Sequence, residues 1–420
     1  MLILAVATAL LAPTVTCLAL NVTNTTSIRQ AATTLAQGLF AYHNPASTIG
    51  QFTLPEPWYW WLSGSAWTAL IDYTAYTNDT AYIPAIHSAL SQNLGPDNDF
   101  VPASQAGWEA NDDQVYWVYA ALTALEYNFP ALPCDSTNSS CQTTSWLAVA
   151  TNAFEDFVTR WSNNSLTCAG GLKWQYNPSA TGNGWNYKNS VSNGGFFQLS
   201  SRLARYTGNT TYADWADKIW NWSADIGLIS PSFHVFDGTS DADGANCSSL
   251  NHEEWSYNLA AYLHGAANMY AYNVNITSAT PSHNTNIVTD FWESAAHSFI
   301  TTANSTFFSP FPNATGIMYE PQCEPKGICN TDQTSFKGSL AGWMAKSAVL
   351  VPSLRADVTG LLRTSASGAV EACSGLGNGS CGTKWYVGGY DGATGLGQEL
   401  GGLDVVLGLL AGEAPGLQFG

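Results

Sequence analysis

Two adjacent aspartates, Asp112 and Asp113, stand in the segment EANDDQVYWVYAAL, directly before an apolar run. Hydrolysis of a glycosidic bond generally needs one carboxylic acid to protonate the leaving oxygen and a second carboxylate that acts as nucleophile or base. When two carboxylates are held close together, one pKa rises, so one member can keep its proton near neutral or mildly acidic pH. Asp112 and Asp113 are therefore our candidate catalytic pair.

The same segment also has a purely structural interpretation. Asn111 followed three residues later by Gln114 resembles a capping box, and acidic residues in a first helical turn suit the helix dipole. Two observations favour catalysis. The helix that follows looks buried on all sides, so the two carboxylates would line a cavity, and the aromatic residues Trp108, Tyr116 and Trp117 surround them, as rings do in clefts that bind sugars.

The composition limits the possible functions. The chain has 420 residues, a formal net charge of −18, 17 Trp and only 10% charged residues. The acidic balance disfavours nucleic acid and anionic membranes as partners, because both are polyanions. The length suits one large domain or two ordinary ones. Since no linker or charge block marks a boundary, we predict one catalytic domain over residues 20–420.

Residues 1–19 (MLILAVATALLAPTVTCLA) predict a secretory signal peptide, because a short apolar core precedes small residues near Cys17 and Ala19. The apolar stretch is too short and interrupted for a membrane-spanning helix. About a dozen N-x-[ST] sequons indicate a glycosylated chain. We expect a secreted or extracellular protein, with association with the cell wall or the plasma membrane left open.

Eight cysteines follow this segment, an even number that fits a disulfide framework in an exported protein. A zinc site would need short C-x₂₋₄-C spacings, which the sequence lacks, and the histidines are scattered. We therefore predict no metal and no cofactor. Proximity in the sequence suggests the pairs Cys134–Cys141, Cys323–Cys329 and Cys373–Cys381, which leaves Cys168–Cys247 as the long bridge.

Helical periodicity dominates the rest of the chain, since apolar residues recur at spacings of three and four. The second helix of each sequential pair is richer in small and aromatic residues, as expected for a helix that is buried all round. Six buried helices, each paired with an outer one, predict an all-α (α/α)6 barrel whose loops are stapled by disulfides. The predicted helices are 27–44, 58–78, 80–94, 111–129, 144–160, 187–207, 210–224, 254–272, 284–304, 332–350, 353–374 and 397–410.

The loops that lead into the inner helices would lie at one end of such a barrel and ring one cleft, together with the aspartate pair. Polar residues at these positions are as well explained by helix capping and buried hydrogen bonds as by contacts with sugar. The tryptophans Trp60, Trp61 and Trp174 have a core alternative to a role as stacking platforms. The predicted substrate-binding residues are Trp61, Asn111, Gln114, Trp174, Asn189, Asn193, Tyr257, Asp332, Gln333 and Lys337.

Several segments resemble the fungal branch of glycoside hydrolase family 76, the endo-α-1,6-mannanases and their cell-wall relatives. They are NDDQVYW, CAGGLKWQ, YKNSVSNGGFFQLSSRLARYTGN, WSYNLAAYLHGAANMY, CNTDQTSFKG and the CSG…CG of residues 373–382. The resemblance covers nearly the whole mature chain. It implies an (α/α)6 barrel, retention of anomeric configuration, Asp112 as the nucleophile and Asp113 as the acid/base. Leu62, Lys173 and Leu259 depart from the residues usual in the family.

The expected function is a retaining endo-acting hydrolase that cleaves α-1,6-mannosidic linkages in mannan or another mannose-containing glycan, and we expect a monomer. Two alternatives remain open. One is a cell-wall transglycosylase acting on the mannose core of glycolipid anchors, and the other is a mannan-binding wall protein without turnover. The chain ends LAGEAPGLQFG, without the apolar tail of a glycolipid-anchor signal, so free secretion and a truncated sequence both stay possible.

Overall fold

The computed structural model describes residues 18–52, 59–133, 144–164, 166–179, 184–242, 244, 246–279 and 283–414. Within these ranges the chain is mainly helical, and each of the twelve predicted helices is present, which confirms the predicted fold class. The helices are α1 (Thr25–Phe40), α2 (Trp60–Thr77), α3 (Ile83–Asn93), α4 (Asn111–Glu126), α5 (Trp146–Asn163), α6 (Ser190–Thr207), α7 (Thr210–Asp225), α8 (Ser256–Ala279), α9 (His283–Phe307), α10 (Phe336–Leu350), α11 (Arg355–Ala372) and α12 (Leu396–Gly408).

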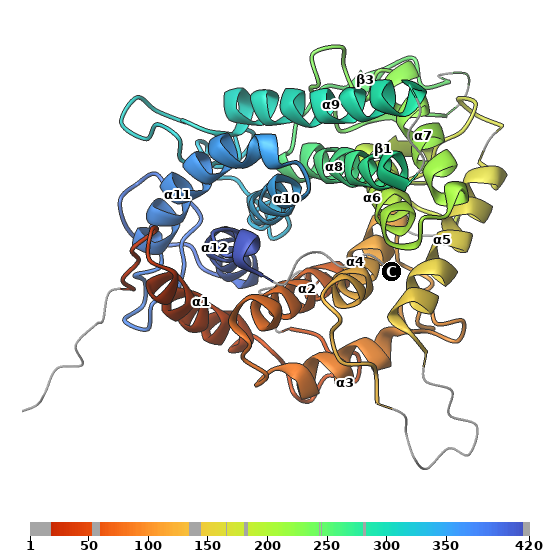
Figure 1. The fold of residues 1–420 in the computed structure, drawn as a ribbon. Helices are drawn as coiled ribbons and strands as arrows, with labels where there is room; N and C mark the ends of the chain where they lie inside the picture. The colour runs from red at the N-terminus through yellow and green to blue at the C-terminus, as the bar shows by residue number, and fades with distance from the viewer. Residues whose placement is uncertain are drawn as a thin grey trace, which may run out of the picture.

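The even-numbered helices form a closed inner ring, and the odd-numbered helices lie outside it (Figure 1). Around the ring each inner helix contacts the next one along the chain, and α12 contacts α2, which closes the circle. Outer helices pack against two neighbouring inner helices at once: α1 contacts α2 and α12, and α5 contacts α4 and α6. The arrangement is the predicted six-pair barrel.

The inner helices carry apolar residues on nearly every face because they are buried on all sides. In α4 the buried residues occupy every face, whereas the outer helix α5 buries a single face that includes Val149, Ala153 and Phe157. Glycine permits the close contacts within the ring. A Cβ atom on Gly195 of α6 would lie 2.8 Å from a methyl group of Val115 on α4, so a larger side chain would push the two helices apart.

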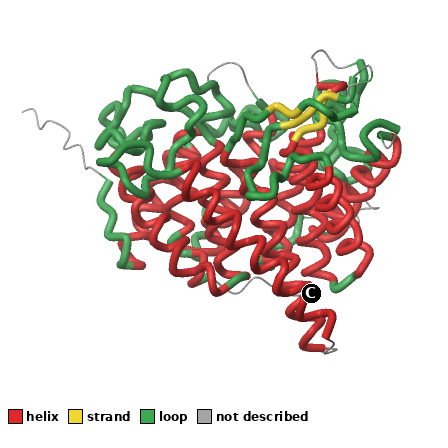
Figure 2. The backbone as a smooth tube through the Cα atoms, turned by 90° about the horizontal axis from the view of Figure 1, so that it is seen from above, coloured by secondary structure: helices red, strands yellow, loops and turns green. Residues whose placement is uncertain are grey.

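The loops gather mainly at one end of the helical layer, together with a small antiparallel sheet (Figure 2). The strands are β1 (Tyr187–Asn189), β2 (Gly238–Ser240) and β3 (Leu250–Asn251), in the order β1-β2-β3. Because outer and inner helices alternate along the chain, the inner helices all begin at the same end. Strand β1 leads directly into α6, so the sheet fixes where that inner helix starts.

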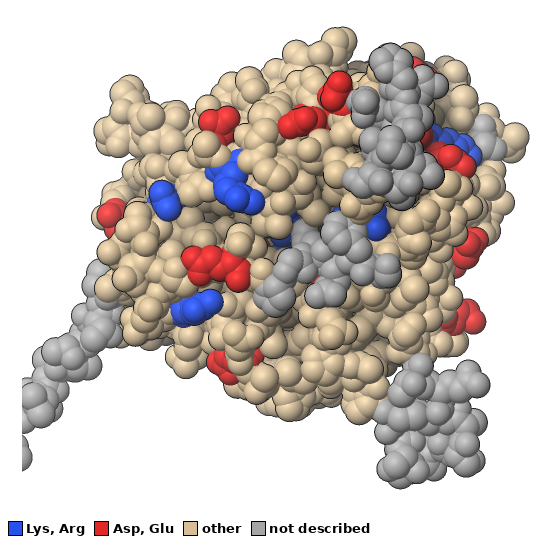
Figure 3. Space-filling model, in the orientation of Figure 1, with Lys and Arg blue, Asp and Glu red and all other residues tan. Residues whose placement is uncertain are grey.

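The structure contains the disulfides Cys168–Cys247, Cys323–Cys329 and Cys373–Cys381. The expected pair Cys134–Cys141 and residues 1–17 of the expected signal peptide lie outside the described residues. Among the residues that the structure describes, no helix is long and apolar enough to cross a membrane. On the face drawn in Figure 3, charged side chains of both signs are scattered among uncharged ones.

Candidate active site

The candidate pair lies at the start of an inner helix, since Asp112 and Asp113 are the second and third residues of α4. The chain before this helix is fixed to a neighbouring segment, because Ala110 forms an isolated antiparallel bridge with Gln175. Asp113 Oδ2 accepts a hydrogen bond of 2.7 Å from the backbone N–H of Ala110. The capping interaction therefore uses Asp113 and an N-cap at Ala110, and the predicted capping box with Gln114 is wrong.

A cavity of about 370 Å³ opens over the two carboxyl groups. Its walls come mainly from segments at the beginnings of inner helices, as the sequence predicted for the barrel end. The lining residues are Tyr59, Trp61, Trp108, Asp112, Asp113, Tyr116, Trp174, Gln175, Tyr257, Asp332 and Phe336.

The Asp112 carboxylate has several hydrogen-bond donors around it. The side chain of Trp174 donates to it, as do its own backbone amide and that of Asp113, the latter at 3.2 Å from Oδ1. Asn189 Nδ2 lies 3.5 Å from Oδ2. Burial, followed by the charge of Asp113, raises the pKa of Asp112 well above the usual range, and these donors oppose that shift. They stabilise the anionic form of Asp112.

Asp113 has fewer donors. Burial raises the pKa of Asp113 to about 7, the nearby charge of Asp332 adds to this rise, and the hydrogen bond from Ala110 opposes it. Two adjacent buried carboxyls cannot easily both be charged, so the pair shares a proton. Asp112 accepts hydrogen bonds from the Asp113 N–H and from Asn189, and Asp113 accepts one from the Ala110 N–H, so both members of the pair have donors that favour an anion.

A third carboxyl group faces the same cavity. Asp332 precedes α10, and its Oδ1 accepts a hydrogen bond of 2.9 Å from Trp61 Nε1 on α2. Burial raises the pKa of Asp332 to about 6, and the bond from Trp61 opposes this rise. Next to it, Tyr257 stacks on Phe336 with ring centroids 3.9 Å apart. Three of the predicted binding residues, Trp61, Tyr257 and Asp332, thus form one wall.

Two tryptophans expose rings at the cavity. Trp108 is 66% exposed and Trp174 is 38% exposed, although large aromatic side chains are usually well buried. Exposed rings of this kind can pack against the apolar faces of sugar rings. Trp108 was noted in the sequence only as a neighbour of the pair. Tyr59, Gln175 and Phe336 were missed as lining residues, and the only available signal was their position close to motif residues or to helix starts.

Asn111 and Gln114 are fully buried behind the pair and do not line the cavity. Arg160 of the outer helix α5 donates to Asn111 Oδ1 at 2.9 Å and to Gln114 Oε1 at 2.5 Å. The amide of Asn111 donates to the carbonyl of Lys173, and that of Gln114 to the carbonyl of Asp99. The prediction that Asn111 and Gln114 contact sugar is therefore corrected, because their side chains hold the first turn of α4 in place.

Three further predicted binding residues lie away from the cavity. Asn193 is fully buried and exchanges hydrogen bonds with the backbone of Leu172. Gln333 pairs with Asn330 in the turn before α10. Lys337 is buried, and its Nζ contacts Glu324 Oε1 at 2.7 Å. The side chains of Asn193 and Lys337 are taken up by structural hydrogen bonds, so the prediction that these two contact sugar is corrected. Gln333 is not among the residues that line the cavity, and its contact with sugar stays a prediction.

Asn189 lies beside the pair and not among the lining residues. It is the N-cap of α6, with Oδ1 accepting from the Ser192 N–H, and this arrangement turns its amide nitrogen toward Asp112. The preceding residue, Lys188, is fully buried, and its Nζ donates to the carbonyls of Asn164 and Thr167.

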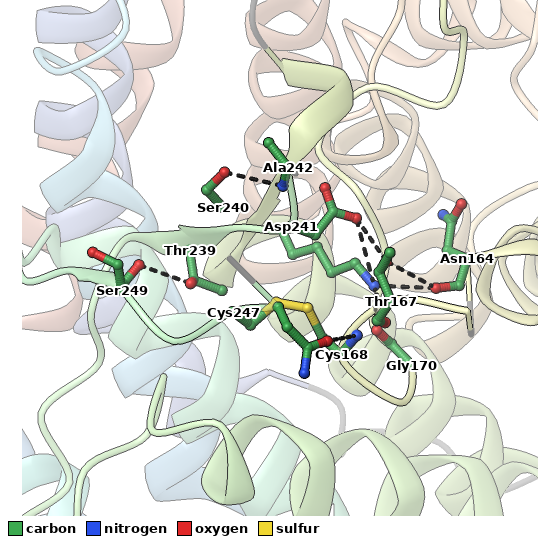
Figure 4. The surroundings of a disulfide bond; sticks show 12 residues. Asn164, Thr167, Cys168, Gly170, Thr239, Ser240, Asp241, Ala242, Cys247 and Ser249 are labelled. Carbon is green, nitrogen blue, oxygen red and sulfur yellow. Dashed lines mark hydrogen bonds and ion pairs between the residues drawn. A yellow bond between two sulfur atoms is a disulfide. The ribbon is translucent and has the colours of Figure 1, made fainter. Parts of the chain in front are cut away.

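The buried carboxylate of Asp241 lies in the surroundings of the Cys168–Cys247 disulfide (Figure 4). Asp241 forms ion pairs with Lys173 at 2.9 Å and with Lys188 at 3.9 Å, next to the Cys168–Cys247 disulfide. Lys173 precedes Trp174 and Lys188 precedes Asn189, and these are the two side chains that donate to Asp112. The ion pairs of Asp241 thus hold the residues that directly precede these two donors.

No group of three or more His, Cys, Asp or Glu side chains placed to hold a metal ion occurs within the described part of the chain. The side chains at the site offer two neighbouring carboxyl groups, hydrogen-bond donors to both of them, and exposed aromatic rings.

The chain resembles proteins of fungal and bacterial origin. It is 37% identical over 402 residues to mannan endo-1,6-alpha-mannosidase DCW1 of Saccharomyces cerevisiae, covering 94% of this chain and 82% of that protein. The crystal structure of Dfg5 from Chaetomium thermophilum in complex with glucosamine matches with a TM-score of 0.83 and 31% identity, over 95% of this chain and 94% of that one.

A bacterial structure shares the fold at lower identity. It is an inactive variant of the alpha-1,6-mannanase GH76A of Salegentibacter sp. HEL1_6, in complex with alpha-1,6-mannotriose. It matches with a TM-score of 0.67 and 18% identity, over 91% of this chain and 99% of that one. The family model of glycosyl hydrolase family 76 matches residues 27–418, nearly the whole chain. The chain therefore belongs to glycosyl hydrolase family 76.

Proposed function

We propose that this protein is a retaining endo-acting glycosidase that hydrolyses α-1,6-mannosidic linkages. The observation that carries the proposal is a pair of adjacent carboxyl groups in one cleft, Asp112 and Asp113, each with a raised pKa and each accepting a backbone hydrogen bond at the start of α4. In this proposal Asp112 acts as the anion and Asp113 carries the proton. The substrate class follows from the relatives, which are named mannan endo-1,6-alpha-mannosidases.

The two aspartates would act in a double displacement. Asp113 donates its proton to the glycosidic oxygen, the bond from that oxygen to the anomeric carbon breaks, and Asp112 attacks this carbon to form a glycosyl-enzyme. Asp113, now a carboxylate, then takes a proton from a water molecule, which displaces Asp112 from the anomeric carbon. Two inversions at the same carbon leave the product with the configuration of the substrate.

The cleft residues have matching roles in this proposal. The exposed faces of Trp108 and Trp174 would stack on mannose rings. Asp332 has one oxygen occupied by Trp61, which leaves the other for a sugar hydroxyl. No metal or cofactor is needed for these steps.

The whole chain from α1 to α12 would form this one catalytic domain. The match to the family model runs from residue 27 to residue 418, and α12 closes the ring against α1 and α2. We further propose that residues 1–19 are a secretory signal peptide and that the protein acts as a monomer outside the cell. An extracellular or cell-wall location fits relatives that are named for acting on mannan.

A proton NMR time course with linear α-1,6-mannooligosaccharides tests the proposal, with the Asp112→Asn variant as the control. The expected result is shorter products whose new reducing ends are α-anomeric before mutarotation, formed by the wild type only. New β-anomeric ends would overturn the retaining mechanism. Products longer than the starting oligosaccharide would show transfer to sugar in place of hydrolysis. No reaction at all would contradict the proposed substrate.

A further inference from the structure

A second and larger cavity lies at the same barrel end as the catalytic cleft, outside the inner ring. It has a volume of about 610 Å³ and is formed by the C-terminal half of α1, the first turn of α12 and the loop of residues 376–380. None of the described residues that line it also lines the catalytic cleft. Cavities of roughly 300–1,000 Å³ are typical of small-molecule sites.

A buried carboxyl group points into this cavity. Glu399 is only 3% exposed, and its Oε1 accepts a hydrogen bond of 2.9 Å from the backbone N–H of Cys381. No hydrogen bond to Oε2 is found among the described residues. Oε2 lies beside Gly38, where an added Cβ atom would sit 2.9 Å from it, and both residues line the cavity. Oε2 thus faces the cavity without a hydrogen bond from the described residues, so it can accept a hydrogen bond from a ligand there or donate one to it.

The loop opposite α1 is held by a disulfide and by hydrogen bonds. The Cys373–Cys381 disulfide closes it at its base, and Gly375 pairs with Ser380 in an isolated bridge. Asn378 Oδ1 accepts hydrogen bonds from the N–H of Ser380 at 3.1 Å and from its hydroxyl at 2.7 Å. Because these contacts fix Asn378 Oδ1, the amide nitrogen of Asn378 is left for another acceptor. The wall of the cavity is thus preformed.

The lining favours an uncharged, hydroxyl-rich ligand. Among the described lining residues Glu399 is the only carboxylate and there is no Lys, Arg or His, so the cavity offers nothing to bind an anion. Burial raises the pKa of Glu399 to about 7, so at mildly acidic pH its carboxyl is neutral and can exchange hydrogen bonds with hydroxyl groups. Further hydroxyl and amide groups come from Thr34, Gln37, Tyr42, Asn378 and Ser380.

We propose that this cavity is a second saccharide-binding site, separate from the catalytic cleft, in which Glu399 and the groups around it bind a neutral glycan chain without cleaving it. It contains a single carboxyl group, so it lacks the pair that hydrolysis requires. Its position at the same barrel end would keep a polymeric glycan close to the cleft.

Calorimetric titration of a catalytically inactive protein tests this proposal. The parent is the Asp112→Asn/Asp113→Asn double variant, produced in a host that does not add N-glycans because Asn378 begins an N-x-S sequon. The titrants are a linear α-1,6-mannotetraose in one arm and a β-linked glucotetraose in the other, at about pH 5.5. We expect two binding sites for at least one oligosaccharide, and the arm that shows the second site identifies its glycan.

Two further changes locate the second site. Glu399→Gln keeps the acceptor for Cys381 but replaces one carboxyl oxygen with an amide nitrogen, and Gln37→Ala removes an exposed side chain of α1 that folding does not need. Each should weaken the second binding event, by about tenfold for Glu399→Gln, as expected for the loss of a buried hydrogen bond. The matched control is Gln30→Ala, an exposed glutamine on the same helix but outside the cavity, which should change neither event.

The outcomes separate this proposal from the proposed function. The inference would be overturned if neither oligosaccharide showed a binding event that Glu399→Gln or Gln37→Ala weakens. Loss of binding in the catalytic cleft alone, with the second event intact, would count against the proposed substrate of the cleft and leave the second site standing. The unfolding temperature of each variant shows whether a loss reflects misfolding.

Discussion

Trp61 on α2 donates its indole N–H to Asp332, 2.9 Å away in the segment before α10, and so connects two inner helices of the barrel at the cleft. Asp332 also acts on the catalytic pair, because its charge raises the pKa of Asp113. Asp332 therefore links the wall of the cleft to the pKa of Asp113, the proposed acid/base.

Replacing Asp332 with Asn should move the alkaline limb of the pH profile of kcat/KM to lower pH. The substitution removes a negative charge that favours the protonated form of Asp113, so Asp113 loses its proton more easily. We expect a shift of several tenths of a pH unit, together with weaker binding of mannooligosaccharide. Trp61→Phe is the matched control for the wall, since it keeps the charge of Asp332. An Asp332→Asn profile that superimposes on the wild-type profile would contradict this link.

Asp112→Asn and Asp113→Asn should differ in their dependence on the leaving group. Asp112→Asn removes the nucleophile, and a loss of at least about 10³-fold in kcat is expected with every substrate. Asp113→Asn removes the proton donor, so a mannoside with an activated aryl leaving group should keep far more activity than mannan. Steady-state rates on both substrates make the comparison. Equal losses for Asp113→Asn on the two substrates would exclude its role as acid.

Asn189→Asp should impair the nucleophile without unfolding α6. An aspartate can still cap the helix through the Ser192 N–H, but it replaces a donor to Asp112 by a second negative charge. The pKa of Asp112 should therefore rise, and the acidic limb of the kcat/KM profile should move to higher pH. Asn189→Ser, which also caps a helix but adds no charge, serves as the control and should lower kcat without that shift. An unchanged acidic limb in Asn189→Asp would show that Asn189 does not act on Asp112.

The sequence predicted the helices and the location of the cleft because both depend on hydrophobic periodicity and on motif positions. It did not predict which side chains face the cleft. Successive residues of a helix point about 100° apart, so a motif such as CNTDQTSFKG marks the barrel end but not the orientation of each side chain. Asp332 and Phe336 of this motif line the cavity, whereas Gln333 and Lys337 are not among the residues that line it.

Lys337→Met should reduce stability and leave KM nearly unchanged. The substitution leaves Glu324 buried without its cation, and breaking a buried ion pair from one side costs about 3–5 kcal/mol. Denaturant unfolding measures this loss, and KM for mannooligosaccharide is measured below the transition. The double variant Lys337→Met/Glu324→Gln also removes the unpaired buried charge of Glu324 and should recover part of the stability. A large rise in KM in a fully folded Lys337→Met protein would restore the sugar contact predicted from the sequence.

The stability of the protein should decline as the pH rises from about 4.5 toward 8, in part because of Glu320. This carboxyl group is fully buried, and it accepts hydrogen bonds from the N–H and the hydroxyl of Ser256 at the start of α8. Burial raises the pKa of Glu320 to about 8 against a usual value of 4.5. Between these two values the unfolded chain releases a proton that the folded chain retains, so rising pH favours unfolding.

Glu320→Gln tests this dependence, because glutamine keeps an oxygen acceptor for Ser256 but cannot ionise. The unfolding temperature of the wild type should fall between pH 5 and pH 8, and that of Glu320→Gln should fall less. Glu126 provides a matched contrast of opposite sign. Burial alone would raise the pKa of Glu126, but Arg202 and Arg205 hold that pKa well below the usual range. The stability that the charged form of Glu126 contributes is therefore lost on acidification, below about pH 4.5. If both proteins lose the same amount between pH 5 and pH 8, Glu320 is not a source of the alkaline instability.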